Sequence, residues 1–256
     1  MSAKPSAPAS ADRVSGTIVV LINLADMLAA LEAAEAATPR LAADEVARHL
    51  NASSSRGTVD AALWRAAHIA LRLLLERYAG PGVRGQAYAI EPGGRPRLYL
   101  PGAQRTAPHF SLSHAGAYAL IALSDVAPVG IDLETERTVT VADARRQRIE
   151  TAAARLATDA HLPDSGNARF LQAWVRLEAV AKASGLGIGR ILTEAGAVGG
   201  SGAADTVPIH AGLVRDLVLP EGCYGAISGL QLPPILLVQQ VTSKAGGLSG
   251  LRGLAG

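Results

Sequence analysis

The sequence contains little cysteine and few aromatic residues. Cys223 is the single cysteine among 256 residues, which excludes an intrachain disulfide and a cysteine metal cluster. Aromatic residues make up 4% of the chain, whereas hydrophobic residues make up 49%, so aliphatic side chains must fill the core. A lone thiol fits a reducing compartment, and we expect a cytoplasmic protein.

A strong charge of one sign and long apolar runs are also missing. The formal net charge is +2, which argues against a nucleic-acid partner bound through a broad basic surface. Asn23 and Asp26 interrupt the apolar run from Thr17 to Leu31, and this run is shorter than the roughly 20 residues that a membrane span needs. We therefore expect neither a nucleic-acid nor a membrane partner.

The hydrophobic pattern predicts an α+β protein. Helical spacing favours helices over 25–37, 41–50, 59–78, 140–160 and 170–184. Alternating or β-branched runs predict strands over 17–22, 86–90, 96–100, 110–113, 118–124, 129–134, 187–192, 207–219, 223–228 and 235–241. The serine-rich segment 51–57 is predicted to be a loop.

The order of these elements suggests two similar α+β halves. A helix followed by strands occurs over 59–134 and again over 170–241, although no strong residue-level repeat accompanies it. We place the halves at 17–127 and 128–242, with the boundary near Pro128. Residues 1–16 are rich in Ser, Ala and Pro and residues 243–256 are rich in Gly, so both are predicted to be flexible tails.

The stretch Val129–Glu134 predicts a buried strand that ends in two carboxylates. Its apolar residues alternate with Gly130, Asp132 and Glu134. Strand side chains two apart share a face, so the two carboxylates point the same way, with Cα atoms roughly 7 Å apart. Hard cations such as Mg²⁺ bind one or two carboxylates together with phosphate and water oxygens. The simpler alternative is a strand whose solvent-facing side carries two charges.

A second polar segment follows the predicted strand 110–113. Ser113 and His114 stand at a turn closed by Gly116, where hydroxyl, imidazole and backbone N–H groups can hold phosphate oxygens. A structural role for His114 is the alternative. A catalytic Ser–His pair is disfavoured, because adjacent residues on a strand point to opposite faces.

A third segment is the predicted helix 170–184. Glu178 and Lys182 are four residues apart and share one face of it. An ordinary exposed pair would stabilise the helix by about 0.2–0.5 kcal/mol. Because the surrounding sequence is apolar, a partly buried pair is the competing interpretation, in which Glu178 is a metal ligand or a general base.

Together these segments resemble the motifs of 4′-phosphopantetheinyl transferases of the long, single-chain, surfactin-synthetase-activating type. Over about residues 17–241, four segments match in order: Gly94-Arg95-Pro96-x-Leu98, Ser113-His114, Gly130-Ile131-Asp132-Leu133-Glu134 and Trp174-x3-Glu178-Ala179-x2-Lys182. The resemblance implies two α+β halves related by a pseudo-twofold axis, and a monomer because both halves would form one site.

The resemblance also implies an activity and a set of site residues. The family transfers the phosphopantetheine arm of coenzyme A to a serine of an acyl or peptidyl carrier protein, releases adenosine 3′,5′-bisphosphate and uses Mg²⁺, for which Mn²⁺ can substitute. By position, the implied metal ligands are Asp132, Glu134 and Glu178, the catalytic pair is Glu178 and Lys182, and the coenzyme A contacts are Arg48, Arg95, Ser113 and His114.

Some positions depart from the family pattern. Leu177 stands where many members have lysine, and Arg176 is the neighbour that could compensate for it. Ala115 and Ser111 replace a common serine and asparagine, and segment 51–57 is serine-rich where basic residues are frequent. These departures leave open a non-catalytic relative that binds the carrier protein or coenzyme A. A third interpretation is an unrelated Mg²⁺-dependent phosphohydrolase.

Overall fold

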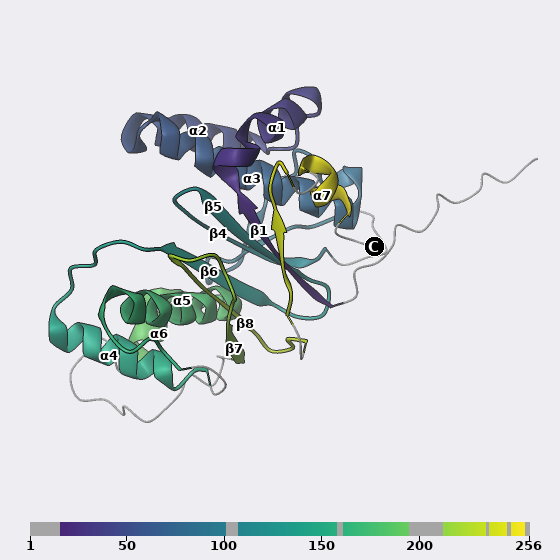
Figure 1. Cartoon of the computed structure of the whole chain (residues 1–256). Coiled ribbons are helices and arrows are strands. Elements are labelled where there is room, and N and C mark those ends of the chain that lie inside the picture. Colours follow the sequence, from purple (N-terminus) through teal and green to yellow (C-terminus); the bar gives the residue numbers. More distant parts are fainter. Residues whose placement is uncertain are drawn as a thin grey trace, which may run out of the picture.

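The computed structural model describes residues 16–100, 107–157, 161–194, 212–233, 236–244 and 247–253. Within these ranges the protein is a mixed α+β structure with several sheets, which confirms the predicted fold class (Figure 1). The predicted tail at 1–16 lies outside the described residues up to residue 15.

The first sheet contains four strands in the order β4-β5-β1-β9. They are β1 (Thr17–Asn23), β4 (His109–Ala115), β5 (Tyr118–Ser124) and β9 (Val238–Val241). β5 is antiparallel to both neighbours, whereas β9 runs parallel to β1. The chain turns from β4 to β5 at Gly116, whose φ of 53° favours glycine.

Helices and a small hairpin accompany this sheet. The helices are α1 (Leu24–Ala37), α2 (Ala43–Arg56), α3 (Thr58–Ala79) and α7 (Gly247–Gly253), and a 3₁₀ turn, η1, spans Pro81–Val83. The hairpin pairs β2 (Ala89–Ile90) with β3 (Pro96–Arg97). The predicted strands 86–90 and 96–100 are therefore shorter in the structure.

The second sheet contains three antiparallel strands in the order β6-β8-β7. They are β6 (Val129–Thr135), β7 (Leu213–Asp216) and β8 (Cys223–Gly229). Its helices are α4 (Asp143–Ala154), α5 (Gly166–Ser184) and α6 (Ile188–Glu194). Read from the other edge, β7-β8-β6 repeats the order β4-β5-β1, because in both sheets the later hairpin pairs its second strand with the strand that opens the half.

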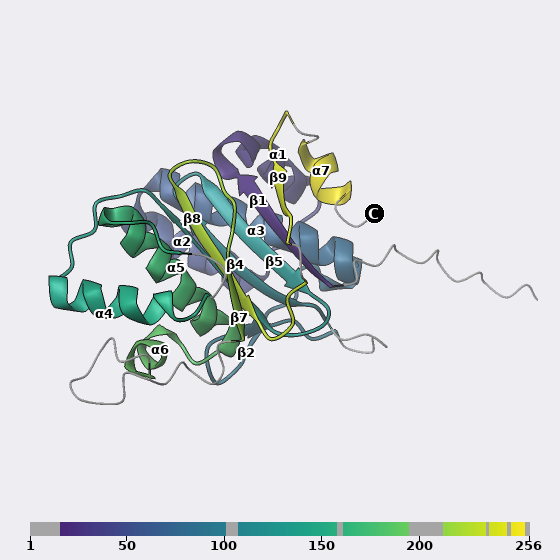
Figure 2. The same ribbon diagram turned by 60° about the horizontal axis from the view of Figure 1, so that its bottom comes forward.

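The two sheets lie between two groups of helices (Figures 1 and 2). Helices α1–α3 and α7 lie on one side, and α4–α6 lie on the other. The alternation of β1 explains this layering: Val20 and Ile22 pack in the core with the first group of helices, whereas Val19 and Leu21 pack against apolar residues of β6 and β8. A strand that reads as one continuous apolar run is thus buried on both faces.

Three predicted segments differ from the structure in kind and not only in length. Segment 51–57 is not a loop: α2 continues through residue 56, and Gly57, with a φ of 84°, follows its last residue. Serine is only a moderate helix former and does not end a helix by itself. Segment 187–192 belongs to helix α6 and not to a strand, because Ile191 and Leu192 are buried against α5 in a helical turn. Short apolar runs do not distinguish these two states.

The C-terminal segment is the third difference. Instead of a flexible tail over 243–256, the structure has helix α7, and Leu251 in it is buried in the core with α1 and α3. Just before it, β9 adds to the first sheet. The second predicted half, 128–242, therefore contributes its last strand to the sheet of the first half. Residues 207–211, predicted to begin a strand, lie outside the described residues.

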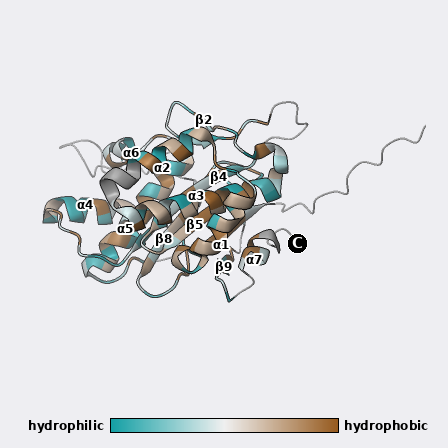
Figure 3. Cartoon of the chain, turned by 90° about the horizontal axis from the view of Figure 1, so that it is seen from above, coloured by the Kyte–Doolittle hydropathy of each residue, from teal (hydrophilic) through white to brown (hydrophobic). Residues whose placement is uncertain are grey.

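Hydrophobic and hydrophilic residues alternate along the helices, as Figure 3 shows for the face that carries α1, α2 and α3. In the part of the chain that the structure describes, no helix combines the length and apolarity required to cross a membrane.

We expect Gly130→Ala to destabilise the protein, because β6 touches α5 at this residue. A Cβ at Gly130 would stand 2.1 Å from the Ala179 carbonyl oxygen and 2.3 Å from the Ala183 nitrogen, both backbone atoms. Overpacking of this kind costs about 1–3 kcal/mol. Chemical denaturation should show a lower midpoint. The matched control is Gly189→Ala in α6, where a Cβ meets nothing within 4 Å and should stabilise by about 0.5–1 kcal/mol. Equal effects in the two variants would contradict the close approach.

Candidate active site

A cavity of about 500 Å³ lies between the two helix-and-sheet units. Its lining joins α2, α3, the β2–β3 hairpin and β4 with the second half of α5 and the loop after it. Five of the eight site residues predicted from the sequence line it: Arg48, Arg95, His114, Glu178 and Lys182. These side chains come from four separate stretches of sequence, so the fold brings together motifs that are far apart in the chain.

Asp132 faces α5 from strand β6 and binds Lys182. Lys182 Nζ lies 2.7 Å from Asp132 Oδ1 and 3.1 Å from the Ile131 carbonyl oxygen. This contact follows from the strand alternation, since Gly130 and Asp132 lie on the face toward α5 while Ile131 packs between the sheets. Asp132 is only 6% exposed, so the pair is a partly buried ion pair and not a solvated one.

Among the described residues, no hydrogen bond or ion pair holds Glu178 in this way, and its pKa is raised. Burial is the largest cause, the negative charge of Asp132 adds to it, and the positive charge of Lys182 opposes it. Glu134 contributes a further, smaller increase in the pKa of Glu178. The charges of Asp132 and Glu134 thus both raise the pKa of Glu178, and a raised pKa makes a carboxylate a stronger base.

The donor set suits a hard cation, but positively charged side chains hold two of the three carboxylates. Asp132 is paired with Lys182, and Glu134 accepts two hydrogen bonds of 3.1 Å from Arg137. Accordingly, among the residues that the structure describes, no three acidic, His or Cys side chains are arranged to hold a metal ion. Carboxylate oxygens on facing elements fit Mg²⁺ chemically, and metal binding here stays a prediction.

The predicted coenzyme A contacts have different environments. Arg48 is exposed at the cavity rim and pairs with Asp44 at 2.7 Å. Arg95 binds Glu91, and its Nη1 donates to the Ala183 carbonyl oxygen at 2.7 Å, which caps the C-terminal end of α5. Both arginines thus place cationic groups at the cavity, and each already holds a carboxylate.

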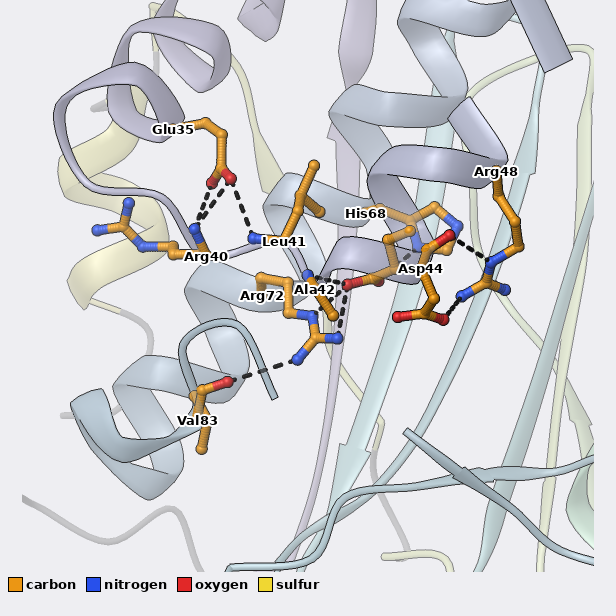
Figure 4. A network of polar contacts seen from close by, with 10 residues as sticks. Glu35, Arg40, Leu41, Ala42, Asp44, Arg48, His68, Arg72 and Val83 are labelled. Atoms are coloured by element: carbon orange, nitrogen blue, oxygen red, sulfur yellow. Dashed lines mark hydrogen bonds and ion pairs between the residues drawn. The ribbon is translucent and has the colours of Figure 1, made fainter. Parts of the chain in front are cut away.

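The structure also contains a buried charge network beside the cavity that the sequence analysis did not identify (Figure 4). The fully buried Glu45 accepts hydrogen bonds from Arg72 Nε at 2.8 Å and from the Ala42 N–H at 2.9 Å, and its Oε1 lies 3.1 Å from His68 Nδ1. Burial raises the pKa of Glu45, but the His68 hydrogen bond and the Arg72 charge outweigh it and leave the pKa lowered. Arg72 also stacks on Tyr88, 3.9 Å from the ring centroid.

The sequence contains a pattern from which this buried network could have been predicted. His68 and Arg72 are four residues apart and share one face of a helix that is otherwise strongly apolar there. Polar residues at helical spacing within an apolar helix indicate a partner buried against that face. His68 and Tyr88 line the cavity, so the network shapes the wall formed by the first half.

Arg176 and Leu177 of helix α5 both point into the protein interior. Leu177 is fully buried in the core formed with α4 and α6, and Arg176 is fully buried as well, where it binds Asp216 at 2.6 and 2.8 Å. Arg176 therefore does not compensate for the missing lysine at position 177, since its guanidinium serves the packing of α5 on β7.

The scan of family models finds none that matches the chain, and the search of curated proteins finds no match either. The assignment of a function consequently depends on the residues and the geometry described above.

We expect Glu178→Gln to stabilise the metal-free protein at neutral pH. The pKa of Glu178 lies above its ordinary value of 4.5 in the folded state, so the charged carboxylate destabilises the fold. This penalty is absent below about pH 4, where the unfolded chain is protonated too, and develops as the pH rises through the folded pKa. In EDTA, the variant should therefore have a higher melting temperature than wild type near pH 8. Near pH 4 the two melting temperatures should be equal.

The control is Glu194→Gln, which removes a carboxylate paired with Arg190 on α6. Such a surface pair stabilises by about 0–1 kcal/mol, so this variant should show no gain in melting temperature at pH 8. A Glu178→Gln shift that is the same at both pH values would contradict the electrostatic explanation.

Proposed function

We propose that this protein transfers the 4′-phosphopantetheine arm of coenzyme A to a serine of an acyl or peptidyl carrier protein. The observation that carries the proposal is the cavity. It gathers Arg48, Arg95 and His114 from the first half opposite Glu178 and Lys182 of the second. Two arginine cations and a histidine facing a carboxylate of raised pKa suit a phosphoryl transfer from a multiply charged substrate.

The topology supports the finer fold assignment. The order β4-β5-β1 with α3 corresponds to β7-β8-β6 with α5. We propose that these units are two halves related by a pseudo-twofold axis, with the boundary between β5 and β6. β9 and α7 have no counterpart in the second half, because they return to the first sheet and its helices. One chain then supplies both walls of the site, which supports a monomer.

The chemistry assigns a task to each group. Arg48, Arg95 and His114 bind phosphate oxygens of coenzyme A, and an arginine fork can bond two oxygens at once. Glu178 accepts the proton of the carrier serine while the serine Oγ forms a bond to the β-phosphorus of coenzyme A. The bond from this phosphorus to the bridging oxygen breaks, and adenosine 3′,5′-bisphosphate leaves. Lys182 provides positive charge beside the reacting phosphate.

A divalent cation would complete the charge balance. Asp132, Glu134 and Glu178 would hold Mg²⁺ or Mn²⁺, which supplies neutralisation of the pyrophosphate oxygens when bound.

The proposal is tested by intact-mass spectrometry of an apo carrier protein incubated with this protein, coenzyme A and Mg²⁺. The carrier should gain the mass of one phosphopantetheine arm on its serine, and EDTA should abolish the gain. Fatty-acid, polyketide and peptide-synthetase carriers should all be included. No gain with any carrier, together with release of phosphate from simple esters, would overturn the proposal in favour of a phosphohydrolase.

Asp132→Asn and Glu178→Gln should each lower the transfer rate by at least about 100-fold, the lower end of a general base's contribution. Both substitutions keep the side-chain shape, so circular dichroism should report an intact fold. Arg190→Gln is the control, since its ion pair with Glu194 lies outside the cavity lining, and its rate should equal that of wild type. Full activity in either site variant would contradict the assignment.

A second candidate is a non-catalytic relative that binds coenzyme A or the carrier protein without turnover. It is favoured by Arg95, whose guanidinium nitrogens already contact Glu91 and the Ala183 carbonyl oxygen. Isothermal titration that shows coenzyme A binding, combined with no mass gain on any carrier, would support this candidate.

A further inference from the structure

Two side chains converge on one oxygen of Asp132. Ser113 Oγ donates a hydrogen bond of 2.8 Å to Oδ1, and Lys182 Nζ lies 2.7 Å from the same atom. Within the described ranges, no hydrogen bond or ion pair of Oδ2 accompanies these two. Oδ1 is thus fixed from two sides, and Oδ2 is the carboxylate oxygen that remains for another ligand.

Strand β4 directs Ser113 away from the cavity. Phe110, Ser111, Leu112 and His114 line the cavity. Strand side chains alternate, and the hydroxyls of Ser111 and Ser113 both form hydrogen bonds with residues of β6. Ser111 Oγ accepts the Ile131 N–H at 3.1 Å. Ser113 is not among the described residues that line the cavity. Its hydroxyl is buried, 8% exposed as a residue, and its proton is committed to Asp132.

We propose that Ser113 is a positioning residue for Asp132 and not a coenzyme A contact. By holding Oδ1, it fixes the plane of the carboxylate and presents Oδ2 to a divalent cation. This inference rests on the proposed function, since it assumes that Asp132 is a metal ligand. It replaces the role that the family resemblance implied for Ser113.

The physical basis is the hydrogen bond to a charged acceptor. Such bonds are shorter and stronger than neutral ones, and a partner that orients a ligating carboxylate commonly changes metal affinity by about 10–100-fold when it is removed. A serine that instead contacted coenzyme A would affect the affinity for the coenzyme and leave the metal affinity unchanged. The two roles therefore predict opposite results.

The test uses Ser113→Ala in the full chain, with Mn²⁺ as the probe. Mn²⁺ accepts the same hard oxygen ligands as Mg²⁺, and its binding is measured by electron paramagnetic resonance without any turnover. We expect the Mn²⁺ dissociation constant to rise about 10-fold or more and the calorimetric dissociation constant of coenzyme A, measured in EDTA, to stay unchanged. Ser113→Thr keeps the hydroxyl and should restore Mn²⁺ affinity.

The matched control is Ser111→Ala. Ser111 lies on the same face of the same strand with similar burial, 7% exposed, but bonds the Ile131 N–H and not Asp132. It should lower the melting temperature and leave the Mn²⁺ dissociation constant unchanged. If Ser113→Ala does not fold, Ser113→Cys provides the comparison, because a thiol is a weak donor of similar size.

The outcomes separate this inference from the proposed function. If wild type binds Mn²⁺ and Ser113→Ala binds it equally well, the positioning role is wrong and the transferase proposal stands. A weaker coenzyme A affinity in Ser113→Ala with unchanged Mn²⁺ affinity would likewise overturn it and restore the role implied by the resemblance. If wild type binds no Mn²⁺, with or without coenzyme A, the metal site itself fails, and the inference fails with it.

Discussion

The site depends on the close approach of strand β6 to helix α5. Gly130 leaves no room for a Cβ against the Ala179 and Ala183 backbone, and this contact fixes the register between strand and helix. Two residues further along β6, Asp132 meets Lys182 on the same helix. Strand side chains repeat every two residues and helical ones every three to four, so a single backbone contact determines which polar pair comes together. Asp132 and Lys182 form an ion pair because the small residues Gly130, Ala179 and Ala183 let the strand and the helix approach closely.

Ion pairs hold the polar side chains around the cavity before any substrate enters. Asp132 pairs with Lys182, Glu134 with Arg137, Arg48 with Asp44 and Arg95 with Glu91. A buried charge without a partner is costly, and the buried Asp132 has its counterion in Lys182. Under the proposed function, an anion bound to Arg48 or Arg95 would replace Asp44 or Glu91 as the acidic partner. Glu178 differs from these carboxylates, since burial and neighbouring negative charge raise its pKa, and the proposed function uses it as the group that receives a proton.

The sequence predicted the elements that carry periodic signals and missed those set by tertiary contacts. Strands β1, β5 and β6 and helices α3 and α5 follow from alternation or helical spacing and lie close to their predicted ranges. The helical state of α6 could not be read in the same way, because its apolar run is short and its packing against α5 decides it. Likewise, the shared face of Asp132 and Glu134 was predictable from period two, whereas the opposing partners, Lys182 and Arg137, depend on distances across elements. The hydrogen bond of Ser113 was not predictable for the same reason: a motif gives the position of a serine, and only the packing of β4 on β6 shows that its hydroxyl meets Asp132.

The return of the chain to the first sheet has a consequence for the cavity. β9 pairs with β1, and α7 packs against the helices of the first half, so the polypeptide leaves the second sheet and returns to the first. The two halves are then joined at both the β5–β6 connection and the segment before β9. Side-chain hydroxyls of β4 add direct bonds to β6. Because the cavity walls come from different halves, any relative movement of the halves would change the distance between the arginines and Glu178. Connections at both ends of the second sheet therefore tie the two walls of the cavity together within one chain.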